Sequence, residues 1–187
     1  MSGPPHLMEL VCSSCRTRPP GFDYARSAAR YEDVMREALH ALKFRGRRGL
    51  AAPLGALLVE AMEGRLPAGV PALLVPVPLH PRRERERGFN QASLLARRVG
   101  LAWRVPVRGD VLVRVVATPS QTELDAPARR ANVRAAFRLR RPELIADRHV
   151  LLVDDILTTG ATLSECARCL REGGAATVGA LTVARVV

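Results

Sequence analysis

Two neighbouring acids and a threonine-rich segment stand out as residues that could do chemistry. Asp154 and Asp155 directly follow an aliphatic run in the segment VLLVDDILTTGATL, residues 150–163. Carboxylates beside an apolar strand cost free energy unless a cation or hydroxyl groups lie next to them. The residues that follow the acids, ILTTGAT, include three threonines and one glycine. The pattern therefore predicts an electropositive or hydroxyl-bearing partner for the acids.

This segment suits a ligand that carries hydroxyl groups near a phosphate. In an open parallel sheet the ligand crevice lies beyond the carboxyl ends of the strands, where Val153 would deliver the two acids. We expect the residues after the acids to turn into a helix, whose first N–H groups form an anion hole. A ribose 5-phosphate fits, because the acids accept hydrogen bonds from ribose hydroxyls while the loop holds the phosphate. The predicted phosphate loop comprises Thr158, Thr159, Gly160, Ala161 and Thr162. A simpler alternative, in which the acids only cap a helix, leaves the glycine between threonines unexplained.

The elements that must position this site alternate along the chain. Short apolar runs predict strands over residues 72–78, 111–116, 149–153 and 176–187. Apolar residues at helical spacing predict helices over residues 31–44, 53–61, 88–100 and 163–172, and a long polar connection precedes Phe137. Strands that alternate with helices predict an α/β fold with a mostly parallel sheet covered on both faces.

The composition narrows the class of protein. The chain has 187 residues and a formal net charge of +11, and Lys43 is the one lysine beside 28 arginines. Arginine suits phosphate groups, although a GC-rich genome would also explain the ratio of arginine to lysine. Only seven aromatic residues are present, so a base-stacking platform is not expected. The sequence shows neither a membrane-spanning run nor a signal peptide, and we expect a cytoplasmic protein.

Several segments resemble a known family in sequence and in order. The acid and threonine segment is similar to the phosphoribosyl-pyrophosphate (PRPP) loop of the type I phosphoribosyltransferases. Upstream, the segments VPVPLHPRRERERGFNQASLLAR, RVVATPSQTEL and RRANVRAAF occur in the order found in the ComF family, and ALKFRGRRGLAAPL resembles that family's first helix pair. The resemblance covers nearly the whole chain. It implies a type I phosphoribosyltransferase fold over residues 23–187, preceded by a short tail over residues 1–22.

The resemblance also implies roles for individual residues. PVPLHPRR corresponds to the pyrophosphate loop, with Leu79, His80, Arg82 and Arg83 near the diphosphate. His80 is open to two interpretations, a general acid or a positioned turn residue. The long polar connection corresponds to the flexible loop that covers the site in these enzymes. Further substrate contacts are expected from Arg87, Gly88, Asn90, Gln91, Arg114, Thr118, Gln121 and Arg129.

Two functions remain open on this evidence. The first is displacement of pyrophosphate from PRPP by an unknown nitrogen nucleophile, with Mg²⁺ held indirectly by Asp154 and Asp155, in a protein linked to DNA uptake in natural transformation. The second is a non-catalytic accessory that retains the PRPP fold and binds single-stranded DNA and other DNA-uptake proteins. Related transferases are often dimers, so a homodimer is a further expectation.

Four cysteines form two C-x-x-C pairs, Cys12 with Cys15 and Cys166 with Cys169. ComF-like proteins usually carry a four-cysteine zinc ribbon ahead of the transferase domain, and here Cys12 and Cys15 correspond to its second pair. A structural Zn²⁺ site wants four ligands. A longer natural N-terminus, a decayed ribbon or ligands from another chain would each account for the difference. Cys166 and Cys169 could also complete the site, although Cys166 lies on an apolar helix face typical of core residues.

Overall fold

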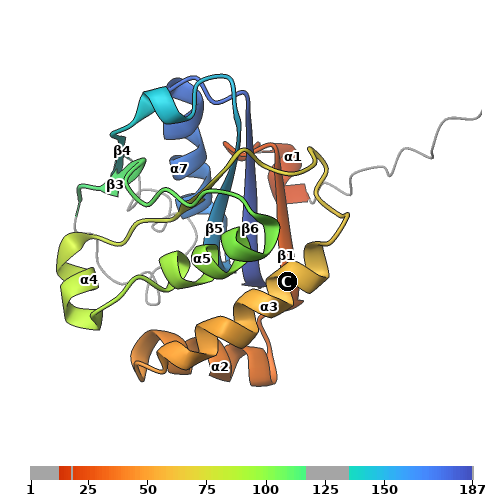
Figure 1. Cartoon of the computed structure of the whole chain (residues 1–187), viewed down its shortest axis with the longest axis vertical. Coiled ribbons are helices and arrows are strands. Elements are labelled where there is room, and N and C mark those ends of the chain that lie inside the picture. Colours follow the sequence, from red (N-terminus) through yellow and green to blue (C-terminus); the bar gives the residue numbers. More distant parts are fainter. Residues whose placement is uncertain (1–12, 18, 117–134, 187) are drawn as a thin grey trace, which may run out of the picture.

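A four-stranded parallel sheet forms the centre of the molecule in the computed structural model, which describes residues 13–17, 19–116 and 135–186 (Figure 1). The strand order is β1-β6-β5-β2. The strands are β1 (Tyr24–Arg30), β2 (Leu73–Pro76), β5 (His149–Leu157) and β6 (Thr177–Arg185). Beyond β2, the amide of Leu74 donates to the carbonyl of Pro106 at 2.9 Å, which brings a further extended segment to that edge. The predicted parallel α/β architecture is confirmed.

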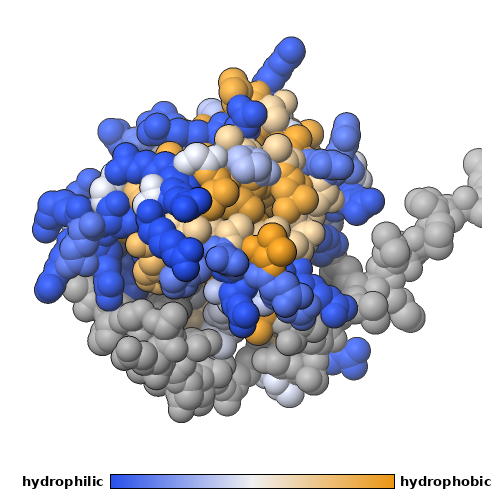
Figure 2. All heavy atoms as spheres, turned by 90° about the horizontal axis from the view of Figure 1, so that it is seen from below, coloured by the Kyte–Doolittle hydropathy of each residue, from blue (hydrophilic) through white to orange (hydrophobic). Residues whose placement is uncertain are grey.

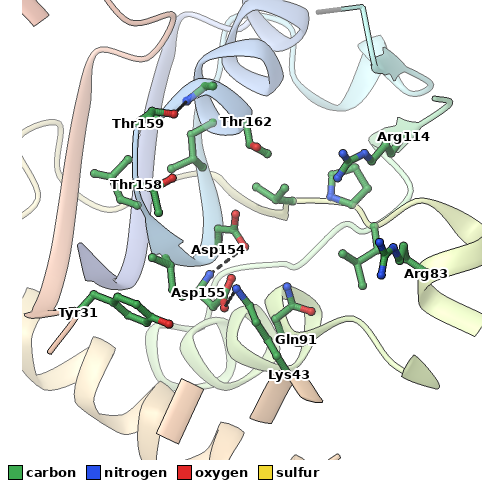
Figure 3. Close-up of a pocket in the computed structure, with 18 of the residues that line it drawn as sticks. Tyr31, Lys43, Arg83, Gln91, Arg114, Asp154, Asp155, Thr158, Thr159 and Thr162 are labelled. Atoms are coloured by element: carbon green, nitrogen blue, oxygen red, sulfur yellow. Dashed lines mark hydrogen bonds and ion pairs between the residues drawn. The ribbon is translucent and has the colours of Figure 1, made fainter. Parts of the chain in front are cut away.

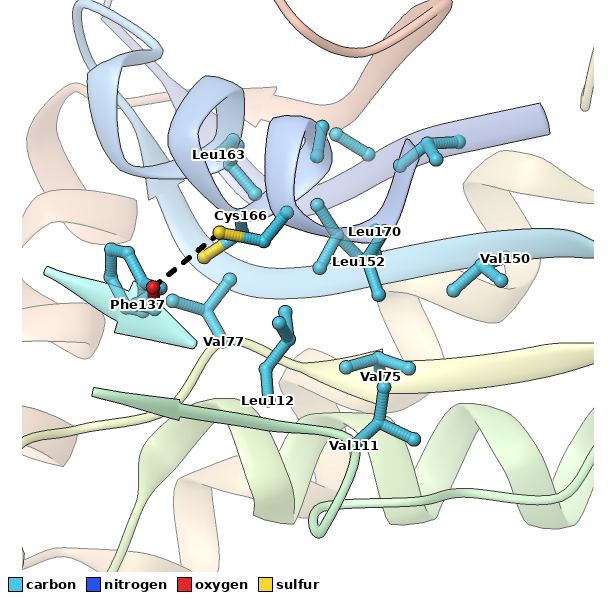
Figure 4. Close-up of a cluster of buried hydrophobic side chains, with 14 of the residues drawn as sticks. Val75, Val77, Val111, Leu112, Phe137, Val150, Leu152, Leu163, Cys166 and Leu170 are labelled. Atoms are coloured by element: carbon cyan, nitrogen blue, oxygen red, sulfur yellow. Dashed lines mark hydrogen bonds between the residues drawn. The ribbon is translucent and has the colours of Figure 1, made fainter. Parts of the chain in front are cut away.

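Helices cover both faces of the sheet because alternate residues of its strands are apolar on each side. On one face, Leu151 and Val153 pack with α2 (Asp33–Phe44), α3 (Ala51–Met62) and α5 (Gln91–Trp103). On the other face, Val150 and Leu152 pack with α7 (Ala161–Glu172), as Figure 4 shows. The predicted apolar face of α7 is confirmed, since Leu163, Cys166, Ala167 and Leu170 are all buried.

Smaller elements complete the α7 side and the connections. An antiparallel pair, β3 (Leu112–Arg114) and β4 (Phe137–Leu139), packs against α7. The remaining elements are the helices α1 (Ser13–Thr17) and α4 (Pro81–Arg87) and the 3-10 turns η1 (Arg48–Leu50) and η3 (Pro142–Leu144). Within the described ranges, none of the helices combines the length and apolar character that crossing a membrane requires.

Three local features differ from the sequence-based expectation. The strand predicted to end at Val153 continues to Leu157, because β6 runs beside it as far as Arg185 and supplies hydrogen-bond partners. The helix predicted over residues 88–100 begins at Gln91, where Asn90 caps α5, and a further helix, α4, precedes it and ends at Gly88 in a left-handed conformation (φ 77°). Strand β1 was not expected, because its sequence YARSAAR is mostly small or polar and half-buried at a sheet edge.

Tyr24 attaches this edge strand to the rest of the sheet. Its ring is buried, and its hydroxyl shares a 2.8 Å hydrogen bond with Nε2 of His149 on β5. Burial raises the pKa of Tyr24 to about 12, so the hydroxyl stays protonated at neutral pH. The ring crosses β6 at Gly179, where a Cβ would overlap the tyrosine ring and lie 2.8 Å from Cδ1 of Leu151. A residue without a side chain is therefore required at Gly179.

We predict that Gly179→Ala lowers the free energy of unfolding by about 2 kcal/mol, the usual effect of overpacking a core. Gly49→Ala is the matched control, because nothing lies within 4 Å of a Cβ built at Gly49. Urea denaturation followed by circular dichroism measures both. Equal midpoints for the two variants would show that Tyr24 does not fix β1 in the way described.

Candidate functional site

A cavity of about 600 Å³ opens at the carboxyl ends of β2 and β5 (Figure 3). Its wall is formed by the end of β5 with the following loop, by the chain between β2 and α4, and by side chains of α2, α4, α5 and β3. Figure 2 looks onto this side of the molecule, where a hydrophobic patch is bordered by hydrophilic residues. The cavity therefore lies where an open parallel sheet is expected to bind its ligand.

Asp155 faces α2 and forms an ion pair with Lys43. Because β5 continues through the acids, its pleat sends Asp155 to the same face as Leu151 and Val153. Nζ of Lys43 lies 2.5 Å from Oδ2 of Asp155, and the two side chains are 20% and 3% exposed. Burial alone would raise the pKa of Asp155, but the Lys43 ammonium and the hydrogen bonds to this carboxylate together outweigh burial and lower that pKa below its ordinary value. Asp155 is thus held in its charged form.

Asp154 points to the other face, on the side of Thr162 (Figure 3). It is half-buried, and its Oδ1 accepts a 2.9 Å hydrogen bond from the amide of Asp155. Burial and the neighbouring negative charge of Asp155 raise the pKa of Asp154 well above its ordinary value. Both acids line the cavity, but they differ: the charge of Asp155 is balanced by the Lys43 ammonium, whereas Asp154 has no such ion pair among the described residues.

The loop after β5 has the form of an anion site. Gly160 adopts a left-handed conformation (φ 72°) and is the first residue before α7, so the backbone N–H groups at the start of α7 face the loop. The side chains of Thr158 and Thr159 are exposed, and the Thr159 hydroxyl accepts a 3.4 Å hydrogen bond from the amide of Ala161. All five predicted phosphate-loop residues line the cavity: Thr158, Thr159, Gly160, Ala161 and Thr162.

The predicted pyrophosphate segment lies across the cavity from this loop. Only some of its predicted contact residues line the cavity. Leu79, His80 and Arg83 line the cavity. His80 precedes α4, and its Nδ1 accepts a 3.3 Å hydrogen bond from the amide of Arg82, so the imidazole caps the helix. Arg82 does not line the cavity, and its guanidinium pairs with Glu86 at 2.9 Å on the exposed side of α4.

Of the other residues predicted to contact substrate, only some line the cavity. Arg87, Gln91 and Arg114 line the cavity, and the Arg87 guanidinium donates to Gln91 and lies over the ring of Phe44. Gly88 and Asn90 do not line it. The buried Asn90 accepts from the amide of Ala92 and donates to the carbonyl of Val77, which fits a role in positioning α5. Three of the predicted contacts, Thr118, Gln121 and Arg129, lie outside the described residues.

One wall of the cavity was not predicted from the sequence. It consists of Tyr31, His40, Lys43, Phe44, Ile156 and Val186. Phe44 and Val186 are 58% and 51% exposed, which leaves apolar surface at the rim. Lys43 carried one signal that could have identified it, since it is the single lysine in a chain of 28 arginines.

The cysteines lie in different surroundings. Cys12 is outside the described residues, and Cys15 is half-buried in α1. Cys166 is fully buried on the inner face of α7, and the thiol of Cys169 donates to the carbonyl of Phe137 at 3.5 Å. Among the residues that the structure describes, no three His, Cys, Asp or Glu side chains come together as a metal site would require. The composite Zn²⁺ site stays a prediction.

The chain is similar to known proteins over most of its length. Residues 86–186 match the family model described as "Phosphoribosyl transferase domain". "DNA utilization protein YhgH" of Salmonella typhi is 39% identical over 176 residues, which cover 90% of this chain and 75% of that protein. "Competence protein ComFC" of Bacillus subtilis is 32% identical over 204 residues, covering 99% of this chain and 76% of that protein. A purine phosphoribosyltransferase structure from Pyrococcus horikoshii is 14% identical with a TM-score of 0.43, covering 71% of this chain and 82% of that one.

We predict that substitution of the two acids changes the free energy of unfolding in opposite ways. Asp155→Asn leaves the Lys43 ammonium without its counter-charge, and we expect a loss of about 2 kcal/mol, somewhat less than for a fully buried pair. Asp154→Asn removes a group whose pKa is raised in the folded state. Such a group adds stability below the ordinary pKa of 3.8, and this contribution disappears as pH rises through the raised value.

Urea denaturation of both variants at pH 5 and pH 8 tests this difference. Relative to the wild type, Asp154→Asn should become more stable between pH 5 and pH 8, whereas Asp155→Asn should be less stable at both. Parallel losses in the two variants would contradict the assignment of unequal charge to the pair.

Proposed function

The chain belongs to the ComF family of proteins with a phosphoribosyltransferase domain, and from this membership we propose that its cavity binds PRPP. The observation that supports the proposal most directly is a carboxylate pair between two anion-binding walls. The loop of residues 158–162 lies on one side of Asp154, and Arg83 and Arg114 lie on the other (Figure 3). PRPP has a matching distribution, with ribose hydroxyls between a 5-phosphate and a diphosphate. The volume of about 600 Å³ falls in the usual range for small-molecule sites.

The residues also fit Mg²⁺. This ion prefers oxygen ligands, keeps several waters and commonly binds through one or two carboxylates together with substrate phosphates. The half-buried Asp154 offers such a carboxylate on the cavity wall, whereas Asp155 is already paired with Lys43. When bound, Mg²⁺ would neutralise charge on the diphosphate. Asp154 is therefore the residue that we propose to hold it, directly or through water.

The reaction proposed for this site is nucleophilic displacement at the anomeric carbon of PRPP. A nitrogen nucleophile forms a bond to the anomeric carbon. The bond between this carbon and the diphosphate oxygen breaks, and its electron pair leaves with pyrophosphate. Positive charge grows on the ribose, as in glycoside hydrolysis, and the carboxylate of Asp155, which is held in its charged form, would stabilise that charge. Arg83, Arg87 and Arg114 would stabilise the negative charge that develops on the leaving pyrophosphate. The start of α7 would hold the 5-phosphate throughout.

The names of the relatives point to a role in DNA uptake. One relative is called a competence protein and another a DNA utilization protein. We propose that this chain acts in the same process, with the acceptor nucleophile still to be identified.

A second candidate function is supported by exposed arginines beside the cavity. Arg82, Arg83 and Arg85 of α4 are exposed, as are Arg45 and Arg47 after α2. Arg48 joins these two segments, because its guanidinium donates to the carbonyl of Gly88 at 2.9 Å. Guanidinium groups in one region suit the phosphates of single-stranded DNA, in the accessory role that would not require catalysis.

Calorimetric titration of PRPP with Mg²⁺ into the protein tests the proposed function. We expect saturable binding to the wild type and none to the Asp154→Asn/Asp155→Asn variant, because the ribose and the metal lose their carboxylates. Circular dichroism must first show that both proteins are folded. Asp110→Asn is the control, since Asp110 forms a 2.8 Å ion pair with Arg108 away from the cavity. Binding that survives the loss of both acids would rule out this site.

Absence of PRPP binding to the wild type would favour the accessory role instead. In that case, affinity for single-stranded DNA should fall steeply between 50 and 200 mM salt, by about 300-fold if six phosphates are contacted. Fluorescence anisotropy with a labelled oligonucleotide measures this dependence.

A further inference from the structure

Residues 21–23 attach the N-terminal segment to α7 and to the start of β6. The amide of Gly21 donates to Oγ of Ser164 at 2.8 Å, and Nε of Arg171 donates to the Gly21 carbonyl at 3.0 Å. Asp23 forms an ion pair with Arg171 and accepts a 2.8 Å hydrogen bond from the amide of Val178. The approach is so close that a Cβ at Gly21 would overlap the Ser164 carbonyl. The sequence assigned Gly21 and Phe22 to a tail, yet both pack on the domain.

Phe22 lies between these anchors and contacts the anion loop. A Cβ built on Gly160 would be 3.7 Å from Cε1 of Phe22 and 3.5 Å from Cδ1 of Leu157. Gly160 and Leu157 line the cavity, whereas Phe22 does not. The phenyl ring is half-buried against the core on the α7 side of the sheet. Phe22 thus supports the loop without being available to touch a ligand in the cavity.

Two of the threonines of the loop, Thr158 and Thr159, give it little internal support. Thr158 and Thr159 are exposed, and the hydrogen bond between Ala161 and Thr159 is long at 3.4 Å. Gly160 is in the left-handed region, which glycine adopts at no steric cost. Phe22 is therefore placed to restrain this turn from outside the cavity.

We propose that residues 21–23 form a clamp that positions the anion loop, with Phe22 as a positioning residue. Cys15 lies in α1, which ends at Thr17, four positions before Gly21. The position of residues 21–23 is thereby coupled to the affinity of the loop for a phosphate group. The expected effect on phosphate affinity rests on the proposed function, whereas the expected effect on the structural order of the loop does not.

Two measurements on Phe22→Ala test the clamp. Amide hydrogen exchange over residues 157–164 should become about tenfold faster, and the affinity for ribose 5-phosphate should fall about tenfold. Phe22→Leu keeps apolar contact with Gly160 and should restore most of both quantities. The control is Leu58→Ala, because Leu58 is fully buried on the opposite face of the sheet. It should lower thermal stability without selectively changing exchange in the loop.

A second pair of variants separates the clamp from loss of the phenyl ring. Gly21→Ala forces the segment away from Ser164 while Phe22 is kept, and Gly49→Ala introduces the same methyl group into open space. Faster loop exchange in Gly21→Ala alone is expected. Unchanged loop exchange in both Phe22→Ala and Gly21→Ala would overturn the proposal. If the wild type binds neither PRPP with Mg²⁺ nor ribose 5-phosphate, the proposed function fails, but the exchange data still decide whether the clamp exists.

Discussion

The ion pair between Lys43 and Asp155 is the interaction on which the site depends. Adjacent residues of a strand face opposite sides of its sheet, so the two acids of β5 cannot share one environment. The pair joins α2 to β5 across the cavity wall, and Lys43 lies 2.5 Å from its partner. Asp155 is buried and charged as a result, while Asp154 is left facing the cavity with a raised pKa. One carboxylate thus has a structural role in orienting α2, and its neighbour is available to a ligand.

The cavity surrounds the end of β5 with groups that prefer anions. Asp154 lies between backbone N–H groups of α7 and guanidinium groups from two other elements, α4 and β3. The N–H groups belong to a helix that packs on one face of the sheet, whereas Lys43 belongs to a helix on the other. A ligand with two anionic ends would bring these helices together around the end of β5. Binding should therefore stabilise the contact between the two layers as well as occupy the cavity.

The sequence was sufficient to predict the fold and most of the site, because both depend on local patterns. The run before Asp154, the glycine among threonines and the helical spacing on α7 are each readable from a short segment. What could not be predicted depends on distant partners. Lys43 lies in α2, 112 positions before Asp155, and no local pattern joins them. Strand β1 is held by Tyr24 and by pairing with β6, and Asn90 is removed from the cavity by a hydrogen bond to Val77.

The single lysine gives the cavity an intrinsic reporter. A protease specific for lysine has one cleavage point in the entire chain, after Lys43, and this bond lies in the last turn of α2. Cleavage requires local unwinding of that turn and separation of the ammonium from Asp155. The rate at which the intact chain is converted into two fragments would thus follow opening of the cavity wall itself, free from the background that 28 arginines would give with a less selective enzyme.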